Sequence, residues 1–137
     1  MISLIAGGKG EGKTKRLIEM ANANVKVSDG HVVFIDDDRR HIYDLHYDIR
    51  FVETTEFPLS NYREFIGFVY GVLSQDNDIT EIFVDGLTNI IKNIDNEDMI
   101  KLKKKLENIH AARGVKFVIS INCNPDELPA GIKELMI

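Results

Sequence analysis

The chain has 137 residues and a formal net charge of −5 at pH 7, and 44% of its residues are hydrophobic while 28% are charged. This length suits one globular domain, so we expect a single domain over residues 1–137. The acidic balance disfavours broad nucleic-acid binding, which usually needs a basic surface. The only cysteine, Cys123, excludes an internal disulfide or a cysteine-rich metal framework.

Short apolar runs alternate with helical patterns along the chain, which is typical of a parallel sheet covered by helices. The run "ISLIA" (residues 2–6) predicts a buried strand that leads into a glycine loop. Residues 14–25 carry apolar side chains at helical spacing. The run "HVVFID" (residues 31–36) predicts a second buried strand, and residues 49–54 predict a weaker strand at an edge.

The second half of the chain continues the alternation. Asn61 followed by Glu64 has the form of a loose capping pair and predicts a helix over residues 62–75. Gly67 and Gly71 lie one turn apart in this helix. Either they let a neighbouring backbone segment approach the helix closely, or they have no packing role and the helix merely accommodates them. "EIFVD" (residues 81–85) predicts a strand, residues 98–112 a helix that Gly114 ends, and residues 115–122 the last clear strand. The tail is expected to form a turn and a fragment of helix.

The stretch "GGKGEGKT" (residues 7–14) matches the phosphate-binding pattern G-x-x-x-x-G-K-[ST] without a gap. Glycines allow the backbone to curl so that its N–H groups hold an anion at a helix N-terminus. Lys13 would reach the β- and γ-phosphates of a nucleoside triphosphate, and the Thr14 hydroxyl would ligate Mg²⁺. The predicted nucleotide-binding residues are Gly7, Gly8, Lys9, Gly10, Glu11, Gly12, Lys13 and Thr14.

Asp85 closes an apolar strand, which is the form of a Walker B strand. Such a carboxylate holds Mg²⁺ directly or through water, so Thr14 and Asp85 are the predicted metal residues. The alternative is an ordinary aspartate that begins the turn at Gly86. Many ATPases of this broad class carry a catalytic Glu at the position of Gly86, so a water-activating carboxylate must come from elsewhere or be absent.

With these motifs the chain resembles RecA-like and KaiC-like P-loop NTPases from residue 1 to about residue 124. The resemblance implies a three-layer α/β fold with a mostly parallel sheet, helices on both faces and a RecA-like (ASCE-type) strand order. In that order the last strand inserts between the phosphate-loop strand and the Asp85 strand. "FIDDD" (residues 34–38), laid against the family pattern "FIDAE", puts Asp38 at the position that polarises the attacking water.

The resemblance also implies a sensor of the γ-phosphate. "HAARGVKFVISIN" (residues 110–122) is similar to the family's helix end and sensor strand. This similarity assigns the sensor role to Asn122, or alternatively to Ser120. The expected catalytic residues are therefore Lys13, Asp38 and Asn122.

The expected function is binding of ATP and Mg²⁺ by a minimal ATPase with slow hydrolysis. ATP is the default nucleotide because "INCNPDE" (residues 121–127) is not the guanine-reading N-K-x-D signature. Two alternatives stay open: a nucleotide-responsive regulatory module without turnover of its own, and a small-molecule phosphotransferase. By resemblance we also expect a homo-oligomer or a partner protein. Nucleic acid is not favoured, no membrane association is expected, and a cytoplasmic location is expected.

The segment after the second strand holds further polar candidates. Arg39 or Arg40 would serve a neighbour's γ-phosphate as an arginine finger, or form an ion pair with the adjacent aspartates. His41 and His46 lie near Asp44 and Asp48, but their spacing fits no standard zinc signature.

Overall fold

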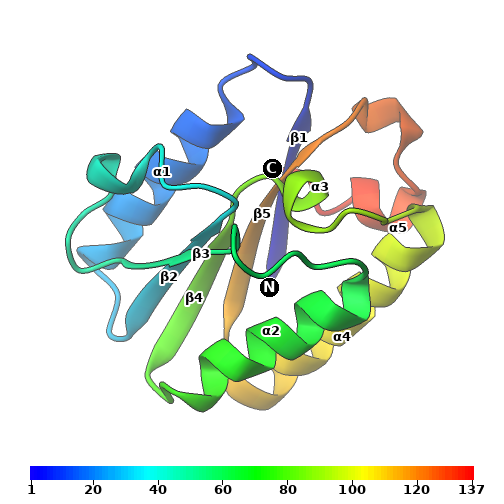
Figure 1. Cartoon of the computed structure of the whole chain (residues 1–137). Helices are drawn as coiled ribbons and strands as arrows, with labels where there is room; N and C mark the ends of the chain where they lie inside the picture. Colours follow the sequence, from blue (N-terminus) through cyan, green and yellow to red (C-terminus); the bar gives the residue numbers. More distant parts are fainter.

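The computed structural model describes all 137 residues and is built on a five-stranded parallel sheet (Figure 1). In sheet order the strands are β1 (Ile2–Gly7), β5 (Lys116–Asn122), β4 (Ile79–Val84), β2 (His31–Asp36) and β3 (Arg50–Glu53). The predicted insertion of the last strand is confirmed, since β5 pairs with β1 on one side and β4 on the other. The complete order, however, is not the usual order of a RecA-like sheet. The weak strand β3 lies at the edge, as predicted, and pairs only with β2.

Helices cover both faces of the sheet, so the three-layer prediction is confirmed (Figure 1). Helix α1 (Lys13–Val25) packs on one face with the segment that holds the short 3-10 helix η1 (Ile42–Asp44). The other face carries α2 (Tyr62–Ser74), α3 (Leu87–Ile90), α4 (Asn96–Arg113) and α5 (Ala130–Lys133). Phe34 packs toward α1, whereas its neighbours Val33 and Ile35 pack toward α2 and α4, as the alternation of side chains along a strand requires.

Local signals account for the helix boundaries. The Asn61 side chain accepts a hydrogen bond from the Glu64 N–H at 3.0 Å, so the predicted cap of α2 is confirmed. Helix α4 begins two residues before its predicted start because Asp95 and Asp98 form a capping box. It ends at Gly114, as predicted, with the left-handed φ of 71° that favours glycine. No helix is both long and apolar enough to cross a membrane.

Two glycines, Gly30 in a crowded environment and Gly67 in an open one, allow the packing around Gly30 to be tested by alanine substitution. A Cβ on Gly30 would overlap the carbonyl oxygen of Asp78 and the side chain of Thr80, whereas a Cβ on Gly67 or Gly71 would meet open space. The glycine pair in α2 is therefore simply tolerated. We expect Gly30→Ala to lower the free energy of unfolding by about 1–3 kcal/mol through overpacking.

The control Gly67→Ala is expected to raise the free energy of unfolding by up to about 1 kcal/mol, because alanine favours a helix more than glycine does. Urea unfolding of the two variants measures both changes. Equal effects in the two variants would contradict the close packing at Gly30.

Candidate functional site

The carboxyl ends of the parallel strands meet beside the N-terminus of α1, where open α/β sheets usually bind ligands (Figure 1). A cavity of about 400 Å³ lies there, and none of its lining residues is hydrophobic. It is lined by Lys9, Gly10, Gly12, Lys13, Thr14, Lys15, Asp36, Asp37, Asp38, Arg40, His41, Asp85, Gly86, Asn89, Ser120 and Asn122. The predicted catalytic and metal residues therefore lie around one polar cavity.

The phosphate loop has the backbone shape that its glycines predict. Gly10 and Gly12 adopt φ values of 80° and 79°, which favour glycine. Gly12 caps α1 without a side-chain hydrogen bond, and the first turn of α1 holds no acidic residue. The first N–H groups of the helix are thus available to an anion, and the helix dipole adds positive potential there. Lys13 Nζ donates a hydrogen bond to the Gly8 carbonyl, so the ammonium group lies over the loop.

Three of the predicted binding residues do not line the cavity. They are Gly7, Gly8 and Glu11. The Glu11 side chain folds over the backbone of the two glycines, where it occupies the space that a Cβ at either glycine would need. These residues therefore shape the loop in this structure, and the other five residues of the stretch line the cavity.

Thr14 and Asp85, which are 71 positions apart in the sequence, are in direct contact. The Thr14 hydroxyl lies 3.2 Å from both oxygens of the buried Asp85 carboxylate. On the other side, the Ser120 hydroxyl donates to Asp85 at 2.9 Å and accepts from the Gly86 N–H at 2.8 Å. A hydroxyl and a carboxylate oxygen are the ligand types that Mg²⁺ takes in nucleotide sites.

The two candidates for the sensor role lie at different depths on β5. Ser120 is buried and its hydroxyl is already engaged by Asp85 and Gly86. Asn122, the last residue of β5, is half-buried and lines the cavity. Of the two side chains, Asn122 is the one that remains free to meet a ligand.

Asp36 is a site residue that the sequence reasoning did not single out. It ends β2 and is only 3% exposed. Its Oδ1 accepts a hydrogen bond from the Asp37 N–H at 2.7 Å, but its Oδ2 has no partner. Burial raises the pKa of Asp36 to about 8, and the Asp37 side chain and the charge of Asp85 add to the increase. A buried carboxyl oxygen without a partner is costly, so this atom is a natural point of contact for a ligand.

A signal for Asp36 was present in the sequence. "HVVFID" has the same form as "EIFVD", an apolar run closed by an aspartate. The two strands are neighbours, with Ile35 paired to Val84, so their terminal aspartates lie beside each other. The sequence alone could not show that these strands are adjacent.

Asp38, the carboxylate assigned by resemblance, lies farther along the loop and is partly exposed. Its Oδ2 accepts from Arg40 Nη2 at 2.7 Å and its Oδ1 from the Arg40 N–H at 2.9 Å. These hydrogen bonds lower the pKa of Asp38. Arg39 lies 3.4 Å from Glu53. Both arginines thus form ion pairs within the chain, and the arginine-finger role remains a hypothesis.

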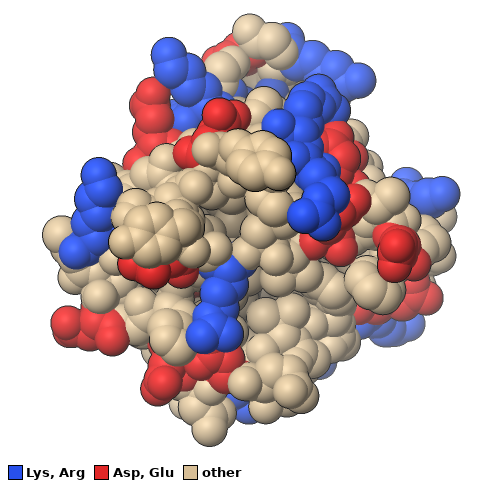
Figure 2. Space-filling model, turned by 60° about the vertical axis from the view of Figure 1, so that its left-hand side comes forward, with Lys and Arg blue, Asp and Glu red and all other residues tan.

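A second hollow of about 360 Å³ adjoins the first between α1 and η1. Both hollows are lined by Thr14, Lys15 and His41. In the second hollow, His41 Nδ1 lies 3.2 Å from Asp44 Oδ2. Acidic and basic side chains are intermingled on the face of the molecule in Figure 2. This face therefore offers no continuous basic surface of the kind that follows a nucleic-acid backbone.

No protein-family model matches the sequence, and a comparison with curated proteins finds no match. In structure, the chain is similar to the flagellar accessory protein FlaH from Methanocaldococcus jannaschii, with a TM-score of 0.65 and 13% sequence identity. The match covers 98% of this chain and 65% of FlaH, so the chain spans slightly less than two thirds of that protein. At this identity the likeness shows the fold alone, which is consistent with a RecA-like fold although the strand order differs from the usual one.

Proposed function

We propose that this protein binds ATP with Mg²⁺ at the phosphate loop and hydrolyses it slowly. The observation that carries the proposal is the contact of Thr14 with Asp85 at the start of α1, where no side chain caps the first N–H groups. An anion cradle beside two oxygen ligands is the arrangement that a magnesium-bound triphosphate requires. The structural likeness to FlaH supports nucleotide binding at this site.

The residues present fit a magnesium ion. Thr14 and Asp85 supply two oxygen ligands at the cavity, and phosphate oxygens and water would fill the remaining positions. Bound Mg²⁺ would supply positive charge to the phosphate oxygens during the transfer. Lys13 would neutralise the γ-phosphate from the loop side, and Asn122 would donate a hydrogen bond to it from β5.

The carboxylate that positions the attacking water is, in our proposal, Asp36 in preference to Asp38. Both line the cavity, but Asp38 is held by two hydrogen bonds from Arg40, while Asp36 Oδ2 is free. In the reaction the water oxygen bonds to the γ-phosphorus, the bond from this phosphorus to the bridging oxygen breaks, and Asp36 accepts the proton of the water in its ionised form, which the charge of a bound Mg²⁺ would favour. The products are ADP and inorganic phosphate.

The proposal includes a second protein surface that would pack against the base of the nucleotide. The cavity contains no hydrophobic lining residue, whereas nucleotide bases usually pack on apolar or aromatic side chains. A second copy of the chain or a partner protein would supply such a surface and would explain a slow rate for the isolated chain.

The hollow beside α1 favours a second candidate function, transfer of the γ-phosphate to a small molecule. It opens next to Thr14 and carries the His41–Asp44 pair, which offers polar groups to an acceptor hydroxyl. In that case release of phosphate would depend on an added acceptor rather than on water.

The test combines ATP affinity, measured by calorimetry, with release of phosphate, measured with and without Mg²⁺. Micromolar binding with slow, Mg²⁺-dependent release supports the ATPase. Binding without release would make the chain a nucleotide-responsive module, and release only with an added acceptor would make it a phosphotransferase. Absence of ATP binding would refute all three functions.

A further inference from the structure

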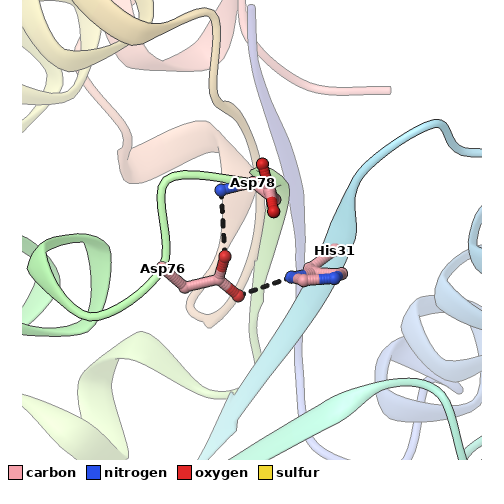
Figure 3. Close-up of side chains that lie close together, drawn as sticks. All are labelled: His31, Asp76 and Asp78. Carbon is pink, nitrogen blue, oxygen red and sulfur yellow. Dashed lines mark hydrogen bonds and ion pairs between the residues drawn. The ribbon is translucent and has the colours of Figure 1, made fainter.

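A second group of polar side chains lies at the opposite end of the sheet from the phosphate loop. His31 begins β2, while Asp76 and Asp78 lie in the turn between α2 and β4 (Figure 3). One ligand atom from each residue lies within 4.8 Å of the others. Tetrahedral ligands of a zinc ion lie about 3.4 Å apart, so small movements of these side chains, including a wider separation of His31 and Asp76, would bring all three to bonding distance.

The backbone around this cluster is held in place by hydrogen bonds. The His31 N–H donates to the Asp78 carbonyl at 2.8 Å, and the Asp78 N–H donates to Asp76 Oδ1 at 2.9 Å. His31 Nδ1 lies 2.6 Å from Asp76 Oδ2 (Figure 3). The Asp78 carboxylate is exposed and lies next to this pair. The three side chains therefore face one another from backbone segments whose positions are fixed.

We propose that His31, Asp76 and Asp78 bind a divalent transition-metal ion, with zinc as the best match. One imidazole nitrogen and two carboxylate oxygens form a ligand set that suits zinc better than Mg²⁺ or Ca²⁺, which prefer oxygen ligands only. The exposed side of the cluster leaves a fourth position for water. A bound ion would tie the start of β2 to the turn before β4 and would stabilise the folded state.

The Arg50 guanidinium would compete with the metal ion for the Asp76 carboxylate. Its Nη1 lies 3.3 Å from Asp76 Oδ2, and its side chain is 55% exposed, so it has room to move away. Zinc binding would displace this guanidinium and replace the hydrogen bond between His31 and Asp76. Removal of the Arg50 charge should consequently strengthen metal binding. If the cluster were only a set of ion pairs that stabilises the fold, this substitution would not create or tighten a metal site.

The experiment uses the full chain, freed of metals, in excess Mg²⁺ so that the oxygen-rich site at the phosphate loop is saturated. Titration with ZnCl₂ is followed by calorimetry, and Co²⁺ is used as a spectroscopic probe. We expect one zinc site, visible absorption typical of four-coordinate Co²⁺, and a melting temperature that rises by several degrees with zinc.

Four variants make the test specific. His31→Gln and Asp78→Asn should each weaken zinc binding at least tenfold, while Arg50→Gln should tighten it severalfold. The control His46→Gln removes another imidazole, 3.9 Å from Asp48, and should leave the affinity unchanged. Asp78 is exposed, so its variant keeps the test valid if His31→Gln fails to fold. Wild-type affinity in both ligand variants, or absence of zinc binding by the wild type, would overturn the proposal.

Discussion

Lys13→Ala is expected to weaken ATP binding by at least about 100-fold while the fold stays intact. A lysine that donates charge-assisted hydrogen bonds to two phosphates contributes on the order of 3 kcal/mol, and each 1.4 kcal/mol is tenfold in affinity. Within the protein the Lys13 ammonium contacts only the Gly8 carbonyl of the exposed loop, so its removal should cost little stability. Calorimetric titration with Mg-ATP measures the change in affinity.

Lys26→Ala is the matched control for this experiment. Lys26 is exposed at the other end of the same helix, so its removal makes the same change in net charge far from the loop. We expect ATP affinity within about twofold of the wild type, because screening weakens the interaction of distant surface charges. If both variants lose affinity equally, the binding is non-specific attraction to positive charge and the site lies elsewhere.

Asp36→Asn is expected to change stability and turnover in opposite directions. Without nucleotide or Mg²⁺, the folded protein keeps a proton on Asp36 up to about pH 8, whereas the unfolded chain loses it near pH 4. The contribution of this group to stability is therefore full below about pH 4 and is lost as the pH rises toward 8. Asparagine resembles the protonated carboxyl and does not titrate.

The melting temperature of Asp36→Asn should therefore exceed that of the wild type at pH 8 by at least a few degrees, the shift that about 1 kcal/mol gives in a domain of this size. The difference should shrink toward zero as the pH falls to about 4. Thermal unfolding in EDTA across this range measures it. A difference that is the same at every pH would show that burial of the Asp36 charge is not its cause.

In the same variant, release of phosphate should fall by about 100-fold or more, because an amide cannot accept the proton of the attacking water. ATP affinity should stay within a few-fold of the wild type. The matched control is Asp38→Asn, which removes a partly exposed carboxylate paired with Arg40 and should change stability by less than about 1 kcal/mol. If Asp38→Asn stops turnover and Asp36→Asn does not, the assignment by resemblance stands and our proposal for Asp36 fails.

Much of the fold could be predicted from the sequence because its signals are local. The apolar run of residues 31–36 marks β2 at its observed bounds, and the Asn61–Glu64 pair marks the start of α2. The short helices η1 and α3 escaped prediction since three or four residues carry no periodicity. The unusual position of β3 beyond β2 depends on which edge of the sheet is free, and a local pattern holds no such information.

The candidate site likewise has a part that the local sequence determines and a part that depends on the tertiary structure. The eight residues 7–14 by themselves determine a glycine-rich turn that opens a helix, because each glycine, the lysine and the threonine act within one continuous segment. Only the tertiary structure decided that Thr14 meets Asp85, that Asp36 rather than Asp38 has a buried, unpartnered oxygen, and that His31 meets Asp76. These pairings depend on strand order and register, which are fixed when the sheet buries both of its apolar faces.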